Sequence, residues 1–396
     1  MAGAETQPSI MLNSREIKQF LAEHFDLIGI CPAISPQGLS RFQQWLDSGY
    51  AGEMDYLPNR REAYAHPKHV LDGVRSIIML GSKYAASNSR PDIKTGVTKK
   101  TGESGRVARY ARSSVDYHDV IHQKLKQAKR FFEDACPSAS FRGVVDTAPL
   151  LEREFAQLAG IGWQGKNTML ISKTDGSWFF LSAILTDLEL EYDQPFEASH
   201  CGTCTACLDA CPTNAFVEPF VMDARKCISY WNIESQDLPD LNLREEIGDW
   251  VFGCDICQEV CPWNRKESAY LTERQTAEIQ LAGEKAGFDG EELVEILKLD
   301  DETFRNRFRK TPFWRSKRRG IMRNVLIVMG NSASHSHIPH LKNALSDDDS
   351  MVRCAAAWAL GQFKVAESRT ALEKALENES DRRVTAEISH AIRKNL

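Results

Sequence analysis

The sequence lacks the features that would place the chain in a membrane or mark it for export. No stretch approaches the roughly 18 consecutive apolar residues that a membrane-spanning helix needs. The first residues, MAGAETQPSIM, contain neither the basic segment nor the apolar segment of a secretion signal. No P-loop occurs, and we expect neither a nicotinamide nor an ATP cofactor. These absences predict a cytoplasmic protein that does not span a membrane.

An excess of positive charge is also missing. The 396 residues carry a net charge of −6, which argues against a chain whose whole surface binds nucleic acid. A chain average can still hide a local basic patch. Hydrophobic residues make up 42% of the chain and charged residues 26%, so the chain is long and apolar enough for two or three globular domains.

Cysteine, by contrast, is concentrated in one region. Eight of the eleven cysteines lie between Cys201 and Cys261. Thiols stay reduced in the cytoplasm, so clustered cysteines there indicate metal or redox chemistry rather than disulfides. The stretch CGTCTACLDACP has the C-x2-C-x2-C-x3-C-P spacing of bacterial two-cluster ferredoxins, in which the fourth cysteine ligates the other cluster. We expect the three remaining cysteines, Cys31, Cys136 and Cys354, to be buried free thiols.

The required second cysteine run is present but incomplete. Cys254, Cys257 and Cys261 repeat the pattern, whereas Val251 stands where the first ligand belongs, and Cys227 is the obvious substitute. The pseudo-symmetry predicts two 4Fe-4S clusters. Their ligands would be Cys201, Cys204, Cys207 and Cys261 for one cluster, and Cys211, Cys227, Cys254 and Cys257 for the other. The alternative is a pair of zinc sites, but zinc does not need proline-terminated triplets.

Residues 1 to about 190 are expected to form one mixed α/β domain. Apolar residues that recur on one face predict helices at 14–25, 116–134 and 149–162. Buried strands are predicted at 74–81 and 142–146, the second ending at Asp146. The segments TMLIS and SWFFLSAILTD, separated by Asp175-Gly176, are expected to pair as a hairpin.

The C-terminal part contains a repeat. Three similar segments place Arg323, Arg353 and Arg383 thirty residues apart, and a second predicted helix follows each of the first two segments. Helix pairs at this period predict a short α-solenoid of the HEAT type, whose units stack to bury a shared face.

A basic segment at 305–323 precedes the repeat. It has nine basic residues and no acidic one, with Phe308, Phe313 and Trp314 between them. Such a run is often only a solvated face of the protein. Basic residues interleaved with aromatics, placed next to a solenoid, favour contact with a nucleic-acid backbone.

Together these stretches resemble one known family. The segments VVDTAPLLEREFAQLAGIGWQGKNTMLI (144–171) and ARYARSSVDYHDVI (108–121), the split cysteine pattern and the HEAT-like tail are similar to those of epoxyqueuosine reductases. The likeness covers essentially the whole chain in the same domain order. The resemblance implies cobalamin and two 4Fe-4S clusters as cofactors, and an oxidoreductase that performs the last step of queuosine formation in tRNA.

The reaction that the resemblance implies reduces an epoxide. Electrons pass through the two clusters to cobalamin, whose cob(I)alamin form reduces epoxyqueuosine at the tRNA wobble position, leaving queuosine and water. No protein side chain supplies such electrons. Asp146 matches the proposed proton donor of the family. For that role its pKa would have to be raised by burial. The alternative is that Asp146 only caps the helix that follows.

The resemblance also implies roles for residues around Asp146. Tyr117 and His118 are expected to position the modified base or relay protons. Asp116-Tyr117-His118 begins like a cobalamin motif with an axial histidine, but Ile121 replaces its glycine. We therefore expect cobalt without a His118 ligand, and helix packing is the alternative role of His118. The expected cofactor contacts are Arg61, Arg109, Asp146, Gln164, Lys166 and Asn167, with Arg60 as a weaker candidate.

The complete prediction is an α+β protein of three parts. Residues 1–190 form a mixed α/β cobalamin-binding catalytic domain, 191–275 a two-cluster ferredoxin-like domain, and 276–396 a basic linker with HEAT-like helical repeats. The expected tRNA contacts are Arg315, Lys317, Arg318, Arg319, Arg323 and Arg353. The other expected partner is an external low-potential electron donor, and we expect a monomer.

Two other functions are compatible with parts of the sequence. One is a cobalamin-dependent reductive dehalogenase or another small-molecule reductase, but a small substrate does not require the basic helical tail. The other is an electron-transfer module on a repeat scaffold. The N-terminal domain of nearly 200 residues argues against that reading, because a ferredoxin uses far fewer residues.

Overall fold

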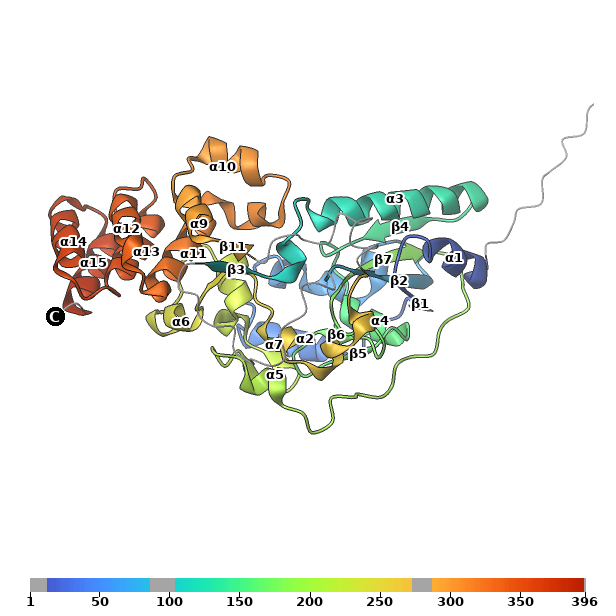
Figure 1. The fold of residues 1–396 in the computed structure, drawn as a ribbon. Coiled ribbons are helices and arrows are strands. Elements are labelled where there is room, and N and C mark those ends of the chain that lie inside the picture. The colour runs from blue at the N-terminus through green and yellow to red at the C-terminus, as the bar shows by residue number, and fades with distance from the viewer. Residues whose placement is uncertain (1–12, 86–103, 273–286, 395–396) are drawn as a thin grey trace, which may run out of the picture.

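An antiparallel sheet of four strands forms the N-terminal end of the molecule (Figure 1). The computed structural model describes residues 13–85, 104–272 and 287–394. The strand order is β1-β2-β7-β4, and every neighbouring pair is antiparallel. The strands are β1 (Leu27–Pro32), β2 (Ser76–Lys83), β4 (Phe141–Val144) and β7 (Phe179–Thr186).

Helices cover both faces of this sheet. Side chains of a strand alternate between the two faces, so Ile78 and Leu80 of β2 pack with α1 (Ser14–Leu21) and α3 (Tyr117–Ala135). Ile77 and Met79 pack with α4 (Glu152–Leu158) on the opposite face. Because both faces are covered, every residue of β2 except Lys83 is buried.

The predicted elements of this domain are largely confirmed, with changed ends. The strands at 74–81 and 142–146 and the helix at 116–134 are present as β2, β4 and α3. The helix predicted at 14–25 ends at Leu21, and that predicted at 149–162 spans only Glu152–Leu158. The shorter α4 follows from Pro149 before it and from Gly160 after it, whose φ of 76° is left-handed.

The predicted hairpin around Asp175-Gly176 is wrong. Strand β6 (Leu170–Ile171) pairs with β5 (Trp163–Gln164), whereas β7 lies between β2 and β4 in the main sheet. An isolated bridge between Ser172 and Gly176 closes the predicted turn, without pairing the two predicted arms. The turn residues were recognised correctly, but two long antiparallel partners outcompete a two-residue strand for β7.

A second, small sheet connects the three predicted parts of the chain. Strand β3 (Gly105–Val107) lies between β10 (Trp250–Phe252), which is parallel to it, and β11 (Gly287–Phe288), which is antiparallel. One hydrophobic core runs from Val107 through Phe252 to the C-terminal helices. The domain boundary near 190 stays a prediction, and the one at 275 lies outside the described residues.

The cysteine region consists of short elements between the two ends of the molecule. They are α5 (Ala206–Asp209), β8 (Phe216–Glu218), β9 (Val221–Met222), a π-helical turn η6 (Tyr230–Glu234), α6 (Leu241–Glu246) and α7 (Ile256–Glu259).

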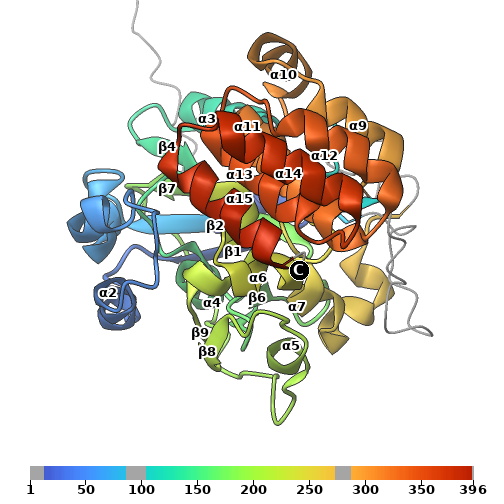
Figure 2. The same ribbon diagram turned by 90° about the vertical axis from the view of Figure 1, so that its left-hand side faces the viewer.

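The C-terminal helices form stacked pairs, as Figure 2 shows. They are α9 (Gly290–Leu297), α10 (Asp301–Phe308), α11 (Lys317–Ser332), α12 (Ile338–Ala344), α13 (Ser350–Leu360), α14 (Ala366–Asn378) and α15 (Arg382–Lys394). Helix α13 packs between α11 and α15, so the predicted solenoid is confirmed. Within the three described ranges, no helix is both long and apolar enough to cross a membrane.

Candidate functional site

Asp146, Tyr117 and His118 meet at one place in the structure. Asp146 lies in the turn between β4 and α4, whereas Tyr117 and His118 begin helix α3. The Tyr117 hydroxyl donates a hydrogen bond to Oδ2 of Asp146. Nitrogen Nε2 of His118 lies 3.1 Å from the same oxygen. Two donors therefore converge on one carboxylate oxygen.

Stacking and a second carboxylate hold the two donors in place. The Tyr117 ring contacts the His118 ring at 4.1 Å and Phe180 of β7 at 4.0 Å between ring centres. Asp116 caps α3 by accepting a hydrogen bond from the His118 backbone amide. The same carboxylate lies 2.8 Å from Nδ1 of His118. The imidazole is thus fixed by a carboxylate at each nitrogen.

These carboxylates determine the charge of His118. Burial by itself would lower the pKa of the imidazole, but the hydrogen bonds and charges of Asp116 and Asp146 raise that pKa to about 9. His118 is therefore protonated at neutral pH. An imidazolium donates from both nitrogens and has no lone pair for a metal. This charge state agrees with the prediction that cobalt has no His118 ligand.

In the structure the pKa of Asp146 is lowered, not raised as a proton donor would require. Burial would raise this pKa, but the hydrogen bonds from His118 and Tyr117 and the charge of His118 lower it below its ordinary value. Asp146 also does not cap α4, since that helix begins after Leu151 without a side-chain cap. Its side chain is 43% exposed. Asp146 is therefore an ionised carboxylate open to a ligand.

Glu152 is the carboxyl group near Asp146 whose pKa is raised. Burial and the charge of Asp146 raise the pKa of Glu152 to about 8. Its oxygen Oε1 is enclosed and has no hydrogen-bond partner among the described residues. The sequence predictions gave Glu152 no role, although it is the glutamate of the D-T-x-P-x-x-E-R motif.

Two distant segments reach the Asp146 turn. Arg315 of η9 (Pro312–Ser316) contributes positive charge that helps to lower the pKa of Asp146, and its Nε lies 2.9 Å from Oε1 of Glu234. Arg60 of η1 (Pro58–Ala65) donates a hydrogen bond of 2.8 Å to the Thr147 carbonyl oxygen. The charge of Arg315, a predicted tRNA-binding residue, thus acts on the predicted catalytic residue.

The glycine-rich loop between α4 and β6 is packed tightly against the protein. Gly160, Gly162 and Gly165 have the Gly-x-Gly-x-x-Gly spacing, but they follow a helix and lie on either side of strand β5, whereas a dinucleotide-binding turn leads from a strand into a helix. A Cβ at Gly162 would stand 2.1 Å from the Ile171 carbonyl oxygen. This close backbone approach explains the glycine without a nucleotide.

Two predicted cofactor contacts in this loop instead support the cysteine region. The Lys166 ammonium donates to the carbonyl oxygens of Gly202 and Cys204, at 2.7 and 2.9 Å. Asn167 is only 3% exposed, and its amide donates to the Cys257 carbonyl oxygen at 3.3 Å. The prediction that Asn167 contacts the cofactor is wrong, because its side chain is buried against a cysteine loop. A cofactor contact of Lys166 stays a prediction.

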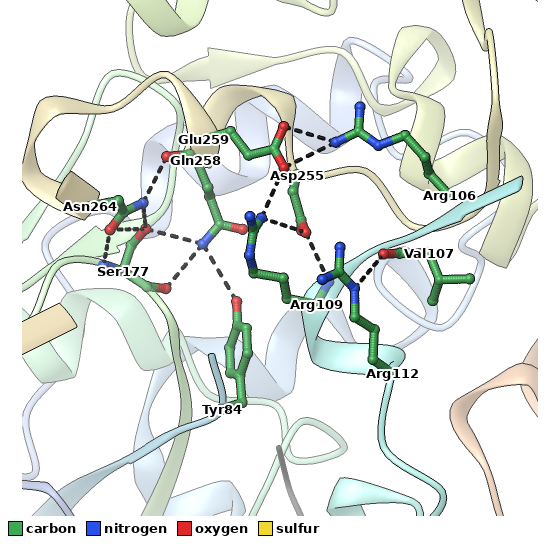
Figure 3. A network of polar contacts seen from close by, with 10 residues as sticks. All are labelled: Tyr84, Arg106, Val107, Arg109, Arg112, Ser177, Asp255, Gln258, Glu259 and Asn264. Carbon is green, nitrogen blue, oxygen red and sulfur yellow. Dashed lines mark hydrogen bonds and ion pairs between the residues drawn. The ribbon is translucent and has the colours of Figure 1, made fainter. Parts of the chain in front are cut away.

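Arg109, another predicted cofactor contact, lies in a buried ion network (Figure 3). Its guanidinium is 3.2 Å from Asp255 and 2.9 Å from Glu259, and its side chain is 4% exposed. Arg106 lies 3.0 Å from Glu259. The prediction for Arg109 is wrong, because internal carboxylates bind its guanidinium. Asp255 and Glu259 lie on either side of Cys257 in sequence, so the network joins the cysteine region to residues near β3.

A second branch of the network uses neutral polar groups. Nε2 of Gln258 donates to Oγ and the carbonyl oxygen of Ser177, both at 3.0 Å. Asn264 accepts the Ser177 backbone N–H at 2.6 Å and donates to Oγ of Ser177 at 2.9 Å. These side chains point toward one another in Figure 3. They fix the second cysteine run against the start of β7.

Arg61 and Gln164 are the remaining predicted cofactor contacts. Arg61 pairs with Asp47 at 2.7 Å, with 37% of its side chain exposed. Gln164 is half-buried at the end of β5, next to the glycine loop. Both stay predictions.

The two cysteine runs have the same local structure. Cys204 precedes α5 and Cys254 precedes α7, and the two short helices pack against each other. Their C-terminal residues Ala210 and Val260 have identical backbone angles, φ −80° and ψ −12°. Each helix is followed by a cysteine and a proline. The structure therefore contains the pseudo-symmetric repeat that the spacing predicted.

Several of the predicted ligand thiols lie near enough to raise one another's pKa, and their assignment to two clusters stays a prediction. Burial raises the pKa of Cys261 to about 11, and thiolates of Cys201 and Cys207 contribute to the same rise. Burial likewise raises the pKa of Cys254, with contributions from Cys257 and Cys227. Cys227 therefore lies near the second run although it is distant in sequence.

The cysteine side chains can be compared with the ligands of a single metal ion. Within the described ranges, no group of three or more histidine, cysteine or acidic side chains surrounds one ion position. A cluster of four irons is wider than one ion, so its thiolate ligands stand farther apart than those of zinc. Of the three cysteines outside the runs, Cys31 and Cys354 are buried as expected. Cys136 is only partly buried, because it ends helix α3 at the surface.

The arginines of the C-terminal part differ in their availability to tRNA. Arg323 is fully buried, and its guanidinium donates to the carbonyl oxygens of Trp231, Ser235 and Asp237. The prediction that Arg323 contacts a phosphate is therefore wrong. Arg353 is paired with Glu379 at 2.7 Å. Of the basic segment's aromatics, Phe308 and Phe313 are buried in the core.

The remaining predicted tRNA contacts are nearer the surface. Lys317 is exposed, with its ammonium 4.0 Å from the centre of the Trp314 ring. Arg319 is 41% exposed and lies 3.2 Å from Asp349. Arg318 is 16% exposed and pairs with Asp347 at 2.6 Å. These contacts stay predictions.

Comparison with known proteins identifies the family. The chain is 36% identical over 337 residues to the epoxyqueuosine reductase of Pseudomonas aeruginosa, covering 85% of this chain and 90% of that protein. It is 33% identical over 350 residues to that of Escherichia coli K12, covering 88% and 89%. The chain belongs to the epoxyqueuosine reductase family. The family model described as epoxyqueuosine reductase QueG, DUF1730, matches residues 65–147.

Other matches of this epoxyqueuosine reductase family member agree with its cysteine region and its C-terminal helical repeats. A model described as a 4Fe-4S double cluster binding domain matches residues 200–264, and a HEAT-repeat model matches 316–393. A crystal structure of epoxyqueuosine reductase with an epoxyqueuosine-modified tRNA-Tyr stem loop superposes with a TM-score of 0.85 at 28% identity, covering 96% of this chain and 98% of that one. The predicted family and fold class are confirmed.

Proposed function

We propose that this protein reduces the epoxide of epoxyqueuosine in tRNA to the alkene of queuosine. The observation that carries the proposal is the Tyr117–Asp146–His118 cluster, an exposed carboxylate that contacts a protonated imidazole. The relatives that cover most of the chain are named for this activity, and one was crystallised with the modified stem loop. The cluster offers the acid that opening an epoxide requires.

The proton at this site starts on His118 rather than on Asp146. Asp146 is the more exposed of the two side chains, at 43% against 25%. A proton on Nε2 of His118 can pass to Oδ2 of Asp146, and from there to the epoxide oxygen. Asp146 is then the donor that touches the substrate, as the resemblance implied, and His118 recharges it. Tyr117 holds the carboxylate in the orientation for both transfers.

Segments beside the Asp146 turn fit a large, flat cofactor such as cobalamin. Helix α2 (Leu39–Asp47) and η1 contain no buried side chain in the structure, although they carry Phe42, Trp45 and Tyr64. The rings of Phe42 and Tyr64 lie 4.8 Å apart. Such half-covered aromatics suit the apolar face of a macrocycle. Arg60 joins η1 to the Asp146 turn.

We propose that these aromatic segments hold cobalamin together with Asp146, Arg61 and Gln164. Bound cobalamin would supply the low-potential reducing chemistry that no side chain provides. The two predicted 4Fe-4S clusters would deliver single electrons from an external low-potential donor. We further propose that the protein acts as a monomer.

The tRNA is proposed to bind along the exposed basic residues near Asp146. Arg315 links the catalytic site to the basic segment, and Lys317 and Arg319 follow it on α11. Phosphate contacts at these residues would position the stem loop. The modified base must leave its stack to reach Asp146.

Anaerobic conversion of the modified tRNA tests this function. The protein, reconstituted with iron-sulfur clusters and cobalamin, is given a chemical reductant and tRNA that contains epoxyqueuosine. Nucleosides are then weighed by mass spectrometry. We expect epoxyqueuosine to lose one oxygen atom with the complete protein. We expect no such loss when cobalamin is omitted. Unchanged epoxyqueuosine with fully loaded protein would contradict the proposal.

A further inference from the structure

Glu152 is an acidic residue near the Tyr117–Asp146–His118 cluster, and the reaction proposed above gives it no role. It is the first residue of α4, and its backbone N–H donates to the Leu150 carbonyl oxygen at 2.9 Å. Its carboxyl group interacts with the backbone of Asp146 and with the charges of Asp146 and His118. Glu152 therefore lies close enough to Asp146 and His118 for the three charges to influence one another.

The environment of Glu152 favours its neutral form on geometric grounds. Oxygen Oε1 is enclosed, and no described residue donates a hydrogen bond to it. An ionised carboxylate with an unsatisfied, enclosed oxygen is costly, whereas a neutral acid loses much less on leaving water. The ionised Asp146 nearby adds like-charge repulsion to that cost. Both effects keep a proton on Glu152.

Other charged groups face Glu152 as well. Arg153, a hydrogen bond from the Asp146 backbone and the protonated His118 favour the ionised form of Glu152. Tyr64 of η1 lies near enough for the charge of Glu152 to raise the pKa of the Tyr64 hydroxyl. The Arg153 guanidinium is itself bound to the Thr168 carbonyl oxygen at 2.7 Å. Burial and Asp146 outweigh these groups, and the pKa of Glu152 reaches about 8. At neutral pH the site therefore holds two protons, one on His118 and one on Glu152.

The proposed reaction consumes two protons. Both carbon–oxygen bonds of the epoxide break, a carbon–carbon π bond forms, and the oxygen leaves as water. The two carbons gain two electrons, which the external low-potential donor supplies one at a time. The oxygen gains two protons. The proton on His118 supplies one of them through Asp146.

We propose that Glu152 stores the second proton of the reaction and passes it through Asp146 to the departing oxygen. This inference rests on the proposed epoxide reduction. In this scheme Asp146 is the catalytic residue that touches the substrate, His118 charges it for the first transfer, and Glu152 charges it for the second. Glu152 is then a positioning residue that acts through Asp146.

Infrared titration of the full-length protein without cobalamin tests the storage of a proton. The wild-type protein is expected to show a protonated carboxyl band at pH 7 that disappears with a midpoint near pH 8. The band should be absent from Glu152→Gln. Glu154→Gln is the matched control, because Glu154 lies on the same helix but binds the Gly38 backbone amide at 2.9 Å. A band that persists in Glu152→Gln, or is missing from the wild type at pH 7, would overturn the proposal.

Single-turnover reduction tests the use of that proton. We expect Glu152→Gln to slow queuosine formation by about 100-fold, the size of a typical general-acid contribution, and to abolish the fall in rate near pH 8. Glu152→Asp should restore part of the rate. A variant with wild-type rate and pH profile would overturn the role of Glu152 and leave the proposed function intact. If even the wild type leaves epoxyqueuosine unchanged, the proposed function fails, whereas the infrared result still decides where the proton resides.

Discussion

Asp146 adopts a backbone conformation that few residues other than glycine take. Its φ is 53°, in the left-handed region, which costs an L-residue roughly 1–2 kcal/mol. The turn after β4 accepts this strain because Tyr117 and His118 bind the resulting carboxylate. Residues in such strained conformations cluster at active sites and ligand-binding positions. The conformation therefore supports a catalytic role for Asp146.

The charge of His118 provides a test at the scale of single residues. Asp146→Asn removes one of the two carboxylates that stabilise the imidazolium, so the pKa of His118 should fall from about 9 toward the ordinary value of about 6.5. Because the folded-state pKa of His118 is raised, its contribution to stability is complete below about pH 6.5 and is lost as pH rises through about 9.

Nuclear magnetic resonance of the imidazole measures this midpoint directly. Asp119→Asn, which makes the same charge change one residue after His118 in α3, should leave the midpoint near 9. An unchanged midpoint in Asp146→Asn would show that Asp146 does not bind the imidazolium.

The sequence predicted which residues form this site, but it did not predict which of them carry a proton. Asp146, Tyr117 and His118 lie in two recognisable stretches, and the structure brings them together. The lowered pKa of Asp146 depends on contacts between positions about thirty residues apart, which no local pattern reveals. Arg109 and Asn167 were misassigned for the same reason, since their partners Asp255 and Cys257 are distant in sequence.

The buried ion network around Arg109 holds separate elements of the structure together. It joins η4 (Arg109–Ala111) to α7 through charges that are almost fully withdrawn from water. Removal of one member of a buried pair leaves its partner uncompensated, so Arg109→Met should lower the free energy of unfolding by about 3–5 kcal/mol. Chemical denaturation measures this change. Arg383→Met removes an exposed pair with Asp237 and should cost no more than about 1 kcal/mol. Equal effects would contradict the assigned role of burial.

A second prediction concerns the iron-sulfur ligands of the two cysteine runs. Cys227 is expected to replace the ligand missing at Val251, so Cys227→Ser should remove about half of the iron bound by the reconstituted protein. Iron and sulfide analysis with electron paramagnetic resonance measures this loss. Cys136→Ser, which changes a cysteine outside both runs, should retain all the iron. Full iron content in Cys227→Ser would exclude Cys227 as a ligand.

Elements with strong periodicity were predictable, and short ones were not. Helix α3 and the solenoid helices follow long apolar patterns, so local sequence determines them. The hairpin prediction failed because β7 finds partners in β2 and β4, which lie about forty or more residues away. A two-residue strand such as β6 has too little periodicity to indicate its partner.

At the scale of the whole molecule, one core joins the ferredoxin-like region to the solenoid. Arg323 lies inside this connection and donates to three carbonyl oxygens of residues 231–237. A positive charge at that position holds two regions together instead of binding tRNA. The sequence could not show that Arg323 is buried, because a thirty-residue spacing is the same for buried and for exposed arginines.

Salt dependence of tRNA binding separates these two uses of arginine. Lys317→Ala and Arg319→Ala should each weaken tRNA binding and reduce the slope of log affinity against log salt by about 1, since each loses one phosphate contact. Arg323→Met should lower stability and leave the slope of the folded protein unchanged. Binding titrations at several salt concentrations measure both. An unchanged slope in Lys317→Ala would remove that residue from the tRNA surface.

The most direct test of the central claim is the rate of queuosine formation by Asp146→Ala. The wild-type protein and the variant are loaded with clusters and cobalamin, matched for iron content and tRNA affinity, and reduced without oxygen in a single turnover. The account predicts queuosine from the wild type and a loss of at least about 100-fold in the variant, because its proton donor to the epoxide oxygen is gone. Equal rates in the two proteins would contradict it.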